Sequence, residues 1–532
     1  MANFLQVTRG GWIDYVETLD TTLRDGAQTR GITFSLRDKL RVLEKLDELG
    51  VDIVEGGWPG SNPKDAEFFR AVRGLSLENS RVAAFGSTRK KGLRAGEDPS
   101  LRAIVESDVP VAVIFGKSWT LHVTEVLRCS LEENLSMATE TVEYLREHGM
   151  EVIFDAEHFF DGWKASREYA IGVLKAAIEG GARTVTLCDT NGGSMPWEVE
   201  AAVRDVAREL PAAHLGIHTH NDAGCGVANT LVAVQGGVRH VQGTLLGTGE
   251  RCGNADLCQV LPNLALKMGY SILKGRVEKL RDLTQISGFV ADLLNLRISD
   301  NHPYVGRNAF AHKAGVHVDA VLKVTRAYEH VDPSLIGNER RFSVSELSGR
   351  STVRYVSSKA GLMLSDDQIA NALEEIKRLE SQGYHLEGAE ATVELLLIRT
   401  AGRLREGFRV VEWSVNVKGS EDVTAQASVT IEVDGGTYRA SGEGVGPVHA
   451  LDNAMRNALL SCFPMLKSVR LTDYKVSVVD GLDGTAAAVR VFIEFSDEGS
   501  IWRTTSVSRN IIDASLGALS DGYRYALNRN LK

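Results

Sequence analysis

The chain has 532 residues, 43% of them hydrophobic and 24% charged, which is the balance of an ordinary soluble globular enzyme. A formal net charge of −10, with no stripe of lysine and arginine, argues against a nucleic-acid binder. No apolar run approaches the ~18 residues that cross a membrane, and residues 1–12 lack the apolar core of a secretory signal. The six cysteines form no CxxC pair, which predicts reduced thiols in a cytoplasmic protein.

From residue 12 to about 250 the sequence repeats one unit: an apolar strand, a polar exit and an amphipathic helical stretch such as Leu36–Leu49. Eight such units in series predict a parallel sheet closed into a (β/α)8 TIM barrel. An open doubly wound sheet is the alternative, but it would require a glycine-rich phosphate fingerprint after the first strand, and none is present. The predicted strands cover residues 12–19, 51–57, 81–87, 109–116, 151–157, 183–189, 214–220 and 240–246.

The pattern changes after the barrel, which we place in residues 1–285. Residues 286–389 are predicted to form a helical connector with a lid, including a helix over 365–383 that begins at Ser365 or Asp366. Residues 390–532 are predicted to form an α+β domain, because two segments there (429–459 and 491–519) repeat the order strand, turn, strand, loop, helix. Such a layer would bury its open face best against a second chain, so a homodimer is expected. The strands predicted in this region cover residues 391–400, 409–417, 427–433, 475–481 and 488–495.

Polar residues gather where the predicted barrel strands end, which is the face where such barrels carry their chemistry. Arg24 and Asp25 follow the first strand within LDTTLRDGAQ; alone, such a pair would usually be a surface salt bridge. HTHND adds His218 and His220, which can aim at one point because residues i and i+2 share a face of a strand. With Asn254 as a weaker fourth ligand, this set predicts a divalent-metal site that keeps room for a chelating substrate. The other polar residues at strand exits are Glu55, Glu157, Asp189, Thr190, Glu250 and Arg251.

The motifs LRDGAQ, HTHND and GTGERCGN, in this order, resemble those of the Claisen-condensing family that holds isopropylmalate, homocitrate and citramalate synthases, and the resemblance covers essentially the whole chain. Within that family, residues 55–65, 115–119 and 187–193 look most like the longer type of citramalate synthase. The resemblance implies a bound Zn²⁺, Mn²⁺ or Mg²⁺. It also implies that acetyl-CoA condenses with pyruvate, that the thioester is then hydrolysed to give (R)-citramalate and CoA, and that this step opens an isoleucine pathway.

The same resemblance assigns roles to individual residues. It implies that Arg24 polarises the α-keto acid, that Thr190 contacts the substrate carboxylate and that Glu157 is an acid of the catalytic centre. His317 and Tyr328 match a catalytic pair outside the barrel, which would have to fold over the rim, onto a neighbouring subunit's barrel in our interpretation. The chemistry requires a base that works near neutral pH, and the choice among His317, Glu157 and Tyr328 stays open.

Two nearby positions fit the family pattern less directly. His312, close to the predicted catalytic histidine, is interpreted as structural. Asp155, two residues before Glu157, is a departure, because a less charged residue would be expected there in a relative. No pocket role is assigned to it.

Three acceptors compete on the sequence: pyruvate, 2-oxoisovalerate and 2-oxoglutarate. The last would require a second cation for its distal carboxylate, and the strand exits offer only Arg89 and Lys117. Trp58 is bulky enough to fill the space that an isopropyl group would need, although it could equally be a packing residue at the rim. Pyruvate is therefore expected, with 2-isopropylmalate synthase activity as the alternative.

Two other classes share features with this chain. A lyase that runs the reverse cleavage would use the same barrel and metal motif, but the simple lyases lack the long C-terminal third. A metal-bearing amino-acid sensor would not need the catalytic residues. In the C-terminal domain, the glycine-rich loop at 442–450 leads into a helix start that could receive an amino-acid carboxylate. Isoleucine is the expected inhibitor and leucine the second choice, while a domain for dimerisation alone is the simpler alternative.

Overall fold

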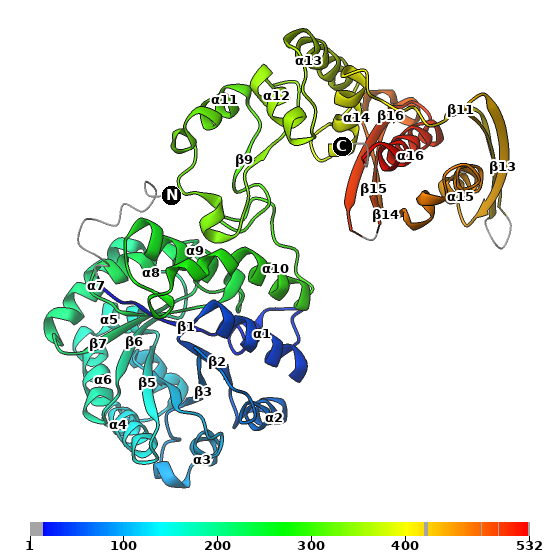
Figure 1. Ribbon diagram of the computed structural model, residues 1–532. Helices are drawn as coiled ribbons and strands as arrows, with labels where there is room; N and C mark the ends of the chain where they lie inside the picture. The colour runs from blue at the N-terminus through cyan, green and yellow to red at the C-terminus, as the bar shows by residue number, and fades with distance from the viewer. Residues whose placement is uncertain (1–13, 420–423, 480, 498, 530–532) are drawn as a thin grey trace. The chain divides into compact units, whose positions relative to one another are not determined.

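Figure 1 shows the computed structural model of the protein. It describes residues 14–419, 424–479, 481–497 and 499–529, so that residues 12, 13, 480 and 498 of the predicted segments lie outside the described residues. The chain divides into two compact units. The first is Met1–Phe310 with Val331–Glu339, and the second is Ala311–His330 with Arg340–Lys532. In the part of the chain that the structure describes, no helix combines the length and the hydropathy of a bilayer-spanning segment.

A closed barrel of parallel strands forms the first unit, and eight strands of the described residues take part in it, in chain order. The sheet closes where β1 pairs with β8, beginning at Glu17 opposite His240. The predicted (β/α)8 barrel is thereby confirmed. The strands are β1 (Glu17–Asp20), β2 (Ile53–Gly57), β3 (Arg81–Ser87), β4 (Val111–Lys117), β5 (Glu151–Glu157), β6 (Thr184–Asp189), β7 (His214–Thr219) and β8 (His240–Gly243).

The first and last strands are shorter than predicted. Before β1, Tyr15 makes only an isolated bridge to Ser271, so that regular pairing begins at Glu17. After β8, the backbone turns at Leu246, whose φ of 61° belongs to the left-handed region and cannot continue a strand. Both deviations lie at the closure of the barrel, where pairing depends on partners distant in sequence.

Helices cover the outside of the barrel (Figure 1). The helix α1 has the predicted bounds, because Ser35 forms a capping box with Asp38 and Gly50 ends the helix with a φ of 93°. The helices of this unit are α1 (Leu36–Leu49), α2 (Pro63–Val72), α3 (Pro99–Glu106), α4 (Leu131–Glu147), α5 (Phe159–Ala165), α6 (Arg167–Glu179), α7 (Pro196–Glu209), α8 (Gly226–Gln235), α9 (Leu257–Pro262) and α10 (Leu283–Leu293).

Apolar side chains fill the interior of the barrel, as in other barrels of this type. They form a buried cluster of Leu19, Ile53, Ala83, Phe85, Val111, Val113 and Ile153, with Trp58 and Phe115 packed against it. The barrel is therefore a filled core rather than a pore, and the chemistry is confined to the rim where the strands end.

The second unit begins with short strands and helices. Ser365 caps α13 through a capping box with Gln368, so that Ser365 is the correct one of the two predicted starts. The strand predicted over 391–400 is wrong, because this segment forms the helix α14. Its buried apolar residues follow one another without a regular spacing, so that the sequence pattern does not distinguish a buried strand from a buried helix. These elements are β9 (Ala311–His312), α11 (Gly315–Lys323), β10 (Arg341–Phe342), α12 (Arg350–Lys359), α13 (Asp366–Ser381) and α14 (Glu390–Thr400).

The C-terminal part of this unit contains the predicted repeat. Within the described residues, one antiparallel sheet has the order β11-β12-β13 and a second has the order β14-β15-β16. A helix follows each sheet, and Val429, Met455, Ile493 and Tyr523 belong to one buried core. The elements are β11 (Arg409–Lys418), β12 (Thr424–Val433), β13 (Gly436–Gly444), α15 (Pro447–Leu460), β14 (Arg470–Val478), β15 (Val489–Ser496), β16 (Ile501–Ser508) and α16 (Ile511–Asn528).

Candidate active site

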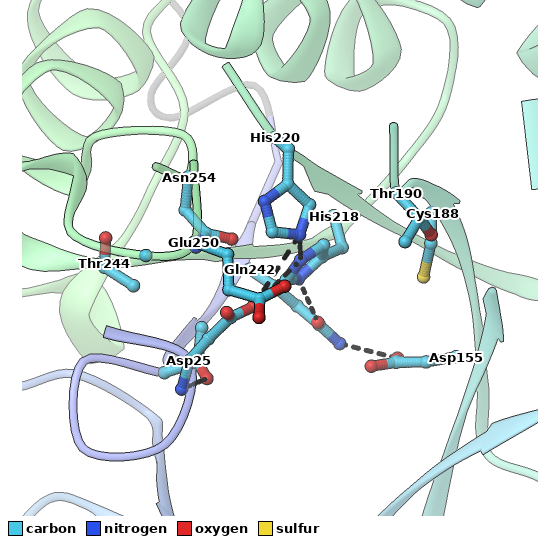
Figure 2. Close-up of polar contacts among 12 residues, drawn as sticks. Asp25, Asp155, Cys188, Thr190, His218, His220, Gln242, Thr244, Glu250 and Asn254 are labelled. Carbon is cyan, nitrogen blue, oxygen red and sulfur yellow. Dashed lines mark hydrogen bonds and ion pairs between the residues drawn. The ribbon is translucent and has the colours of Figure 1, made fainter. Parts of the chain in front are cut away.

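The side chains of Asp25, His218 and His220 point toward one another at the rim of the barrel (Figure 2). Asp25 Oδ2 lies 3.5 Å from His218 Nε2 and 3.9 Å from His220 Nε2, and the two Nε2 atoms lie 3.4 Å apart. One ligand atom from each residue fits within 4.8 Å of the other two, and all three residues are buried. The predicted trio of metal ligands is thus brought together at one point.

Burial sets the protonation of this cluster. Burial and the neighbouring His220 lower the pKa of His218 to about 3, and burial also lowers the pKa of His220. For Asp25, burial acts to raise the pKa, but neighbouring groups, Arg24 first among them, lower it. At pH 7 the site therefore holds one carboxylate and two neutral imidazoles, which is the state in which these groups bind metals.

A buried acceptor atom on Asn254, without a hydrogen-bond partner in the described part of the chain, indicates that a cation fits here. Asn254 stands opposite His220 in an isolated bridge, and its Nδ2 donates to the carbonyl of Thr248 over 3.1 Å. Its Oδ1 is buried and has no hydrogen-bond partner among the described residues. A buried acceptor left without a partner is costly. A carboxylate, two imidazoles and one free amide oxygen make a donor set that fits a divalent cation.

Arg24 is held beside the cluster by several contacts. Its Nε donates to Glu55 Oε2 over 2.6 Å, Nη1 lies 3.5 Å from Asp25 Oδ2, and the guanidinium carbon lies 3.7 Å from the centroid of the Phe85 ring. Burial opposes its charge, but Glu55 and Asp25 raise its pKa. The cation is therefore fixed next to the metal ligands before any substrate arrives.

Thr190 lies on the side of the site near Cys188 in Figure 2. Its hydroxyl accepts a hydrogen bond from the backbone N–H of His158 over 2.8 Å, and its carbonyl accepts one from Arg251 over 2.7 Å. The proton of the hydroxyl stays available for an acceptor such as a substrate carboxylate.

The cations that were considered for a second carboxylate already have partners. Lys117 forms an ion pair with Glu157 across neighbouring strand ends. Arg89 donates to Glu140 over 2.7 Å and to Glu133 over 2.8 Å. Both cations are committed to carboxylates of the chain itself.

Trp58 belongs to the aromatic layer at the top of the barrel interior. Its ring meets Phe85 and Phe115 edge to face, with centroids 5.7 Å apart in both pairs. Its backbone N–H donates to Asp65 over 2.9 Å, and the buried Lys39 lies 2.5 Å from the same carboxylate. Phe85 also contacts Arg24. Phe85 therefore contacts both Trp58 and the residue that is predicted to polarise the substrate.

The predicted catalytic pair outside the barrel forms a unit of its own. The rings of His317, on α11, and Tyr328 are stacked with centroids 4.1 Å apart, and both side chains are exposed. His312 Nε2 lies 3.4 Å from Glu329 Oε1, and Arg340 holds the same carboxylate, which fits the structural role expected of His312. These residues belong to the second compact unit.

The sequence analysis did not identify Gln242 as a site residue. It lies in β8 between His218 and Asp155 and joins the two by hydrogen bonds (Figure 2). A lone glutamine inside a short strand carries no spacing signal, and only the register of β8 against β7 places it beside His218.

Models of known families match three successive parts of the chain. HMGL-like covers residues 15–290, homocitrate synthase post-HMGL domain-like covers 304–384, and the LeuA allosteric (dimerisation) domain covers 387–527. The chain is 50% identical to an (R)-citramalate synthase of Sulfolobus acidocaldarius, over 96% of this chain and 97% of that protein. An (R)-citramalate synthase of Aquifex aeolicus is 46% identical, with coverage of 96% and 97%. The chain belongs to the (R)-citramalate synthase family.

A probable 2-isopropylmalate synthase of Methanopyrus kandleri is 33% identical, over 96% of this chain and 98% of that protein. The identity to this enzyme is lower than the identity to the two citramalate synthases above, although the same share of this chain, 96%, is covered. The resemblance inferred from the three sequence motifs is thus confirmed.

Proposed function

We propose that the protein is an acyltransferase that condenses acetyl-CoA with pyruvate and hydrolyses the thioester, giving (R)-citramalate and CoA. The observation that carries this proposal is the cluster of Asp25, His218 and His220 at the rim of a barrel, in a chain 50% identical to an (R)-citramalate synthase. The product is a branched hydroxy acid that suits the first step of isoleucine synthesis.

The site can bind and polarise an α-keto acid. A divalent cation held by Asp25, His218, His220 and Asn254 would supply Lewis acidity to the keto oxygen. Arg24, fixed by Glu55, adds a positive charge for the oxygen on which negative charge develops. The hydroxyl proton of Thr190 is available to the substrate carboxylate.

The reaction breaks a C–H bond of the acetyl methyl group and forms a C–C bond to the keto carbon. The keto oxygen takes up a proton to become the hydroxyl of the product. Water then cleaves the thioester and CoA leaves as the thiol, which makes the overall reaction effectively irreversible. We assign the proton transfers to Glu157 together with His317 and Tyr328, whose stacked rings would close over the rim of a neighbouring subunit's barrel. Histidine is a common general base in enzymes.

Pyruvate is the proposed acceptor among the three keto acids. The side chain of Trp58, packed on Phe85, would occupy the space of an isopropyl group. The pairing of Lys117 with Glu157 and of Arg89 with Glu140 disfavours 2-oxoglutarate, because a second carboxylate would find no unpaired cation in these two.

We further propose a division of labour along the chain: catalysis in residues 1–285, a connector and lid in 286–389, and dimerisation with feedback inhibition in 390–532. The match of residues 387–527 to the LeuA allosteric (dimerisation) domain supports a homodimer.

Isoleucine is the proposed inhibitor, and a cavity of about 470 Å³ supports this role. Its lining includes Val448 and His449 of the first turn of α15, where Gly446 offers no side-chain cap to the N–H groups of the helix start. The carboxylate of the amino acid would sit there, against apolar walls from Val448 and Leu471. The cavity is lined by Val448, His449, Asp452, Asn453, Arg456, Arg470, Leu471 and Tyr474.

The product identifies the activity. Purified protein with a divalent cation, acetyl-CoA and pyruvate should form a compound that co-elutes with (R)-citramalate on a chiral column, with one CoA thiol released per product. Formation of 2-isopropylmalate from 2-oxoisovalerate at a higher rate would make the alternative activity the correct one.

A further inference from the structure

Gln242 is buried beside the metal-ligand cluster, and its two amide atoms face different partners. Its Oε1 lies 2.9 Å from His218 Nδ1. Its Nε2 lies 2.9 Å from Asp155 Oδ1 and 3.3 Å from Thr186 Oγ1. Gln242 is 1% exposed and Asp155 is 4% exposed, so that water does not compete for these contacts.

The partners of Nε2 fix the orientation of the amide. Burial and the charge of Glu55 raise the pKa of Asp155 to about 7. In its ionised form Asp155 accepts and does not donate, so it requires the NH₂ group on its side. His240 Nε2, which lies 3.4 Å from Gln242 Nε2, can also accept, because His240 Nδ1 is used as the donor to Glu17 over 2.9 Å. The reverse orientation would place the amide oxygen against the oxygen of Asp155 and lose these contacts.

The orientation of the amide then selects the tautomer of His218. An amide oxygen can only accept, so His218 must carry its proton on Nδ1. The lone pair of the neutral imidazole is thereby left on Nε2, the atom that faces His220 and Asp25. With the opposite tautomer, an N–H would point at the place where the cation binds.

We propose that Asp155 and Gln242 are positioning residues for the metal site, and that the relay Asp155–Gln242–His218 keeps Nε2 of His218 unprotonated and aimed at the cation. The relay also explains the departure at Asp155, whose carboxylate serves the histidine through one intervening amide. This inference rests on the proposed metal site. It predicts an effect on the binding of the metal alone, before any substrate is present.

Binding of Co²⁺ to the full-length, metal-stripped protein tests the relay, with a chelator competition for the affinity and the visible absorption band for the ligand geometry. Gln242→Met keeps the length of the side chain but offers no comparable acceptor, and should weaken Co²⁺ binding about 10- to 100-fold. Gln235→Met, at an exposed position at the end of α8, is the matched control and should bind as the wild type does.

A double variant that exchanges the carboxylate and the amide between the two positions serves as a control for misfolding. In the double variant Gln242→Glu with Asp155→Asn, the new amide at 155 donates to the new carboxylate at 242, which accepts from His218 Nδ1. The single change Asp155→Asn should weaken Co²⁺ binding, and the double variant should return to within about 3-fold of the wild type and regain its absorption band.

The outcomes distinguish a failure of the metal-site hypothesis from a failure of the relay hypothesis. If the wild type shows no Co²⁺ site that His218→Ala removes, the metal site itself is wrong and the relay falls with it. If that site exists but Gln242→Met binds Co²⁺ as tightly as Gln235→Met, or the double variant binds no better than Asp155→Asn, the relay alone is overturned.

Discussion

The guanidinium of Arg24 is joined to the buried carboxylate of Glu55 through a contact of 2.6 Å between Nε and Oε2. Glu55 is completely buried, so that the pair is shielded from water, and its attraction is stronger than that of a surface pair. Since Nε is occupied by Glu55, the remaining nitrogens of Arg24 are directed by a fixed planar group rather than by a free side chain. Arg24 thus combines permanent charge with a preset direction.

Replacement of Arg24 by lysine should therefore impair catalysis although the charge is kept. A lysine cannot contact Glu55 and present a second donor in the same plane. We expect kcat/KM for pyruvate to fall by about 100-fold, which is the scale for loss of one preorganised donor. Co²⁺ binding should change little. Arg30→Lys, at an exposed position in the same loop, is the control, and a loss below about 3-fold in Arg24→Lys would contradict the role of geometry.

Removal of the Trp58 ring should widen the choice of acceptor. In Trp58→Ala the space beside Phe85 becomes available to a branched side chain, so the ratio of kcat/KM for 2-oxoisovalerate to that for pyruvate should rise by about 10-fold or more. Trp197→Ala removes a ring that is 68% exposed and should leave the ratio unchanged. An unchanged ratio in Trp58→Ala would show that Trp58 serves packing alone.

The sequence predicted those features that depend on local spacing. His218 and His220 were found because i and i+2 share a strand face, and α1 was bounded correctly because its caps are local. The helix α14 was predicted as a strand because an apolar run buried on all sides has no period. The ends of β1 and β8 depend on pairing between residues more than two hundred positions apart, and the contact of Gln242 with His218 depends on the register of β8 against β7. No local pattern encodes either.

The opposite end of the barrel offers a test of stability. There Glu17 lies 2.9 Å from His240 Nδ1 and from Arg183 Nη1, and 3.2 Å from Arg81. Burial opposes ionisation of Glu17, but the hydrogen bond from His240 and the charge of Arg183 outweigh it and lower the pKa of Glu17. A lowered pKa of a carboxyl group contributes stability above its ordinary value of 4.5, and that contribution is lost as the pH falls through the folded value.

Glu17→Gln should therefore reduce the free energy of unfolding of the barrel by about 2–3 kcal/mol at pH 7. The difference from the wild type should narrow as the pH is lowered below about 4.5. Urea unfolding followed at several pH values measures both effects. Glu44→Gln, at an exposed position of α1, should show neither, and a difference that stays constant down to pH 3 would refute the ionic explanation.

Filling the C-terminal cavity should abolish feedback inhibition. Val448→Phe places a ring among the lining residues, so that isoleucine at millimolar concentration should no longer inhibit, while activity without the effector is kept. Val445→Phe alters a residue of the same loop that is 81% exposed and should keep the response. If the unchanged enzyme responds to neither isoleucine nor leucine, the domain serves assembly alone.

Thiol release from acetyl-CoA, measured with each of the three keto acids, tests the proposed activity and its metal site together. The wild type, stripped of metal and then reloaded with a divalent cation, should release CoA fastest with pyruvate. The stripped enzyme and His218→Ala should release none above background. Full activity in metal-free His218→Ala would contradict the metal site, and a preference for 2-oxoisovalerate would contradict the proposed acceptor.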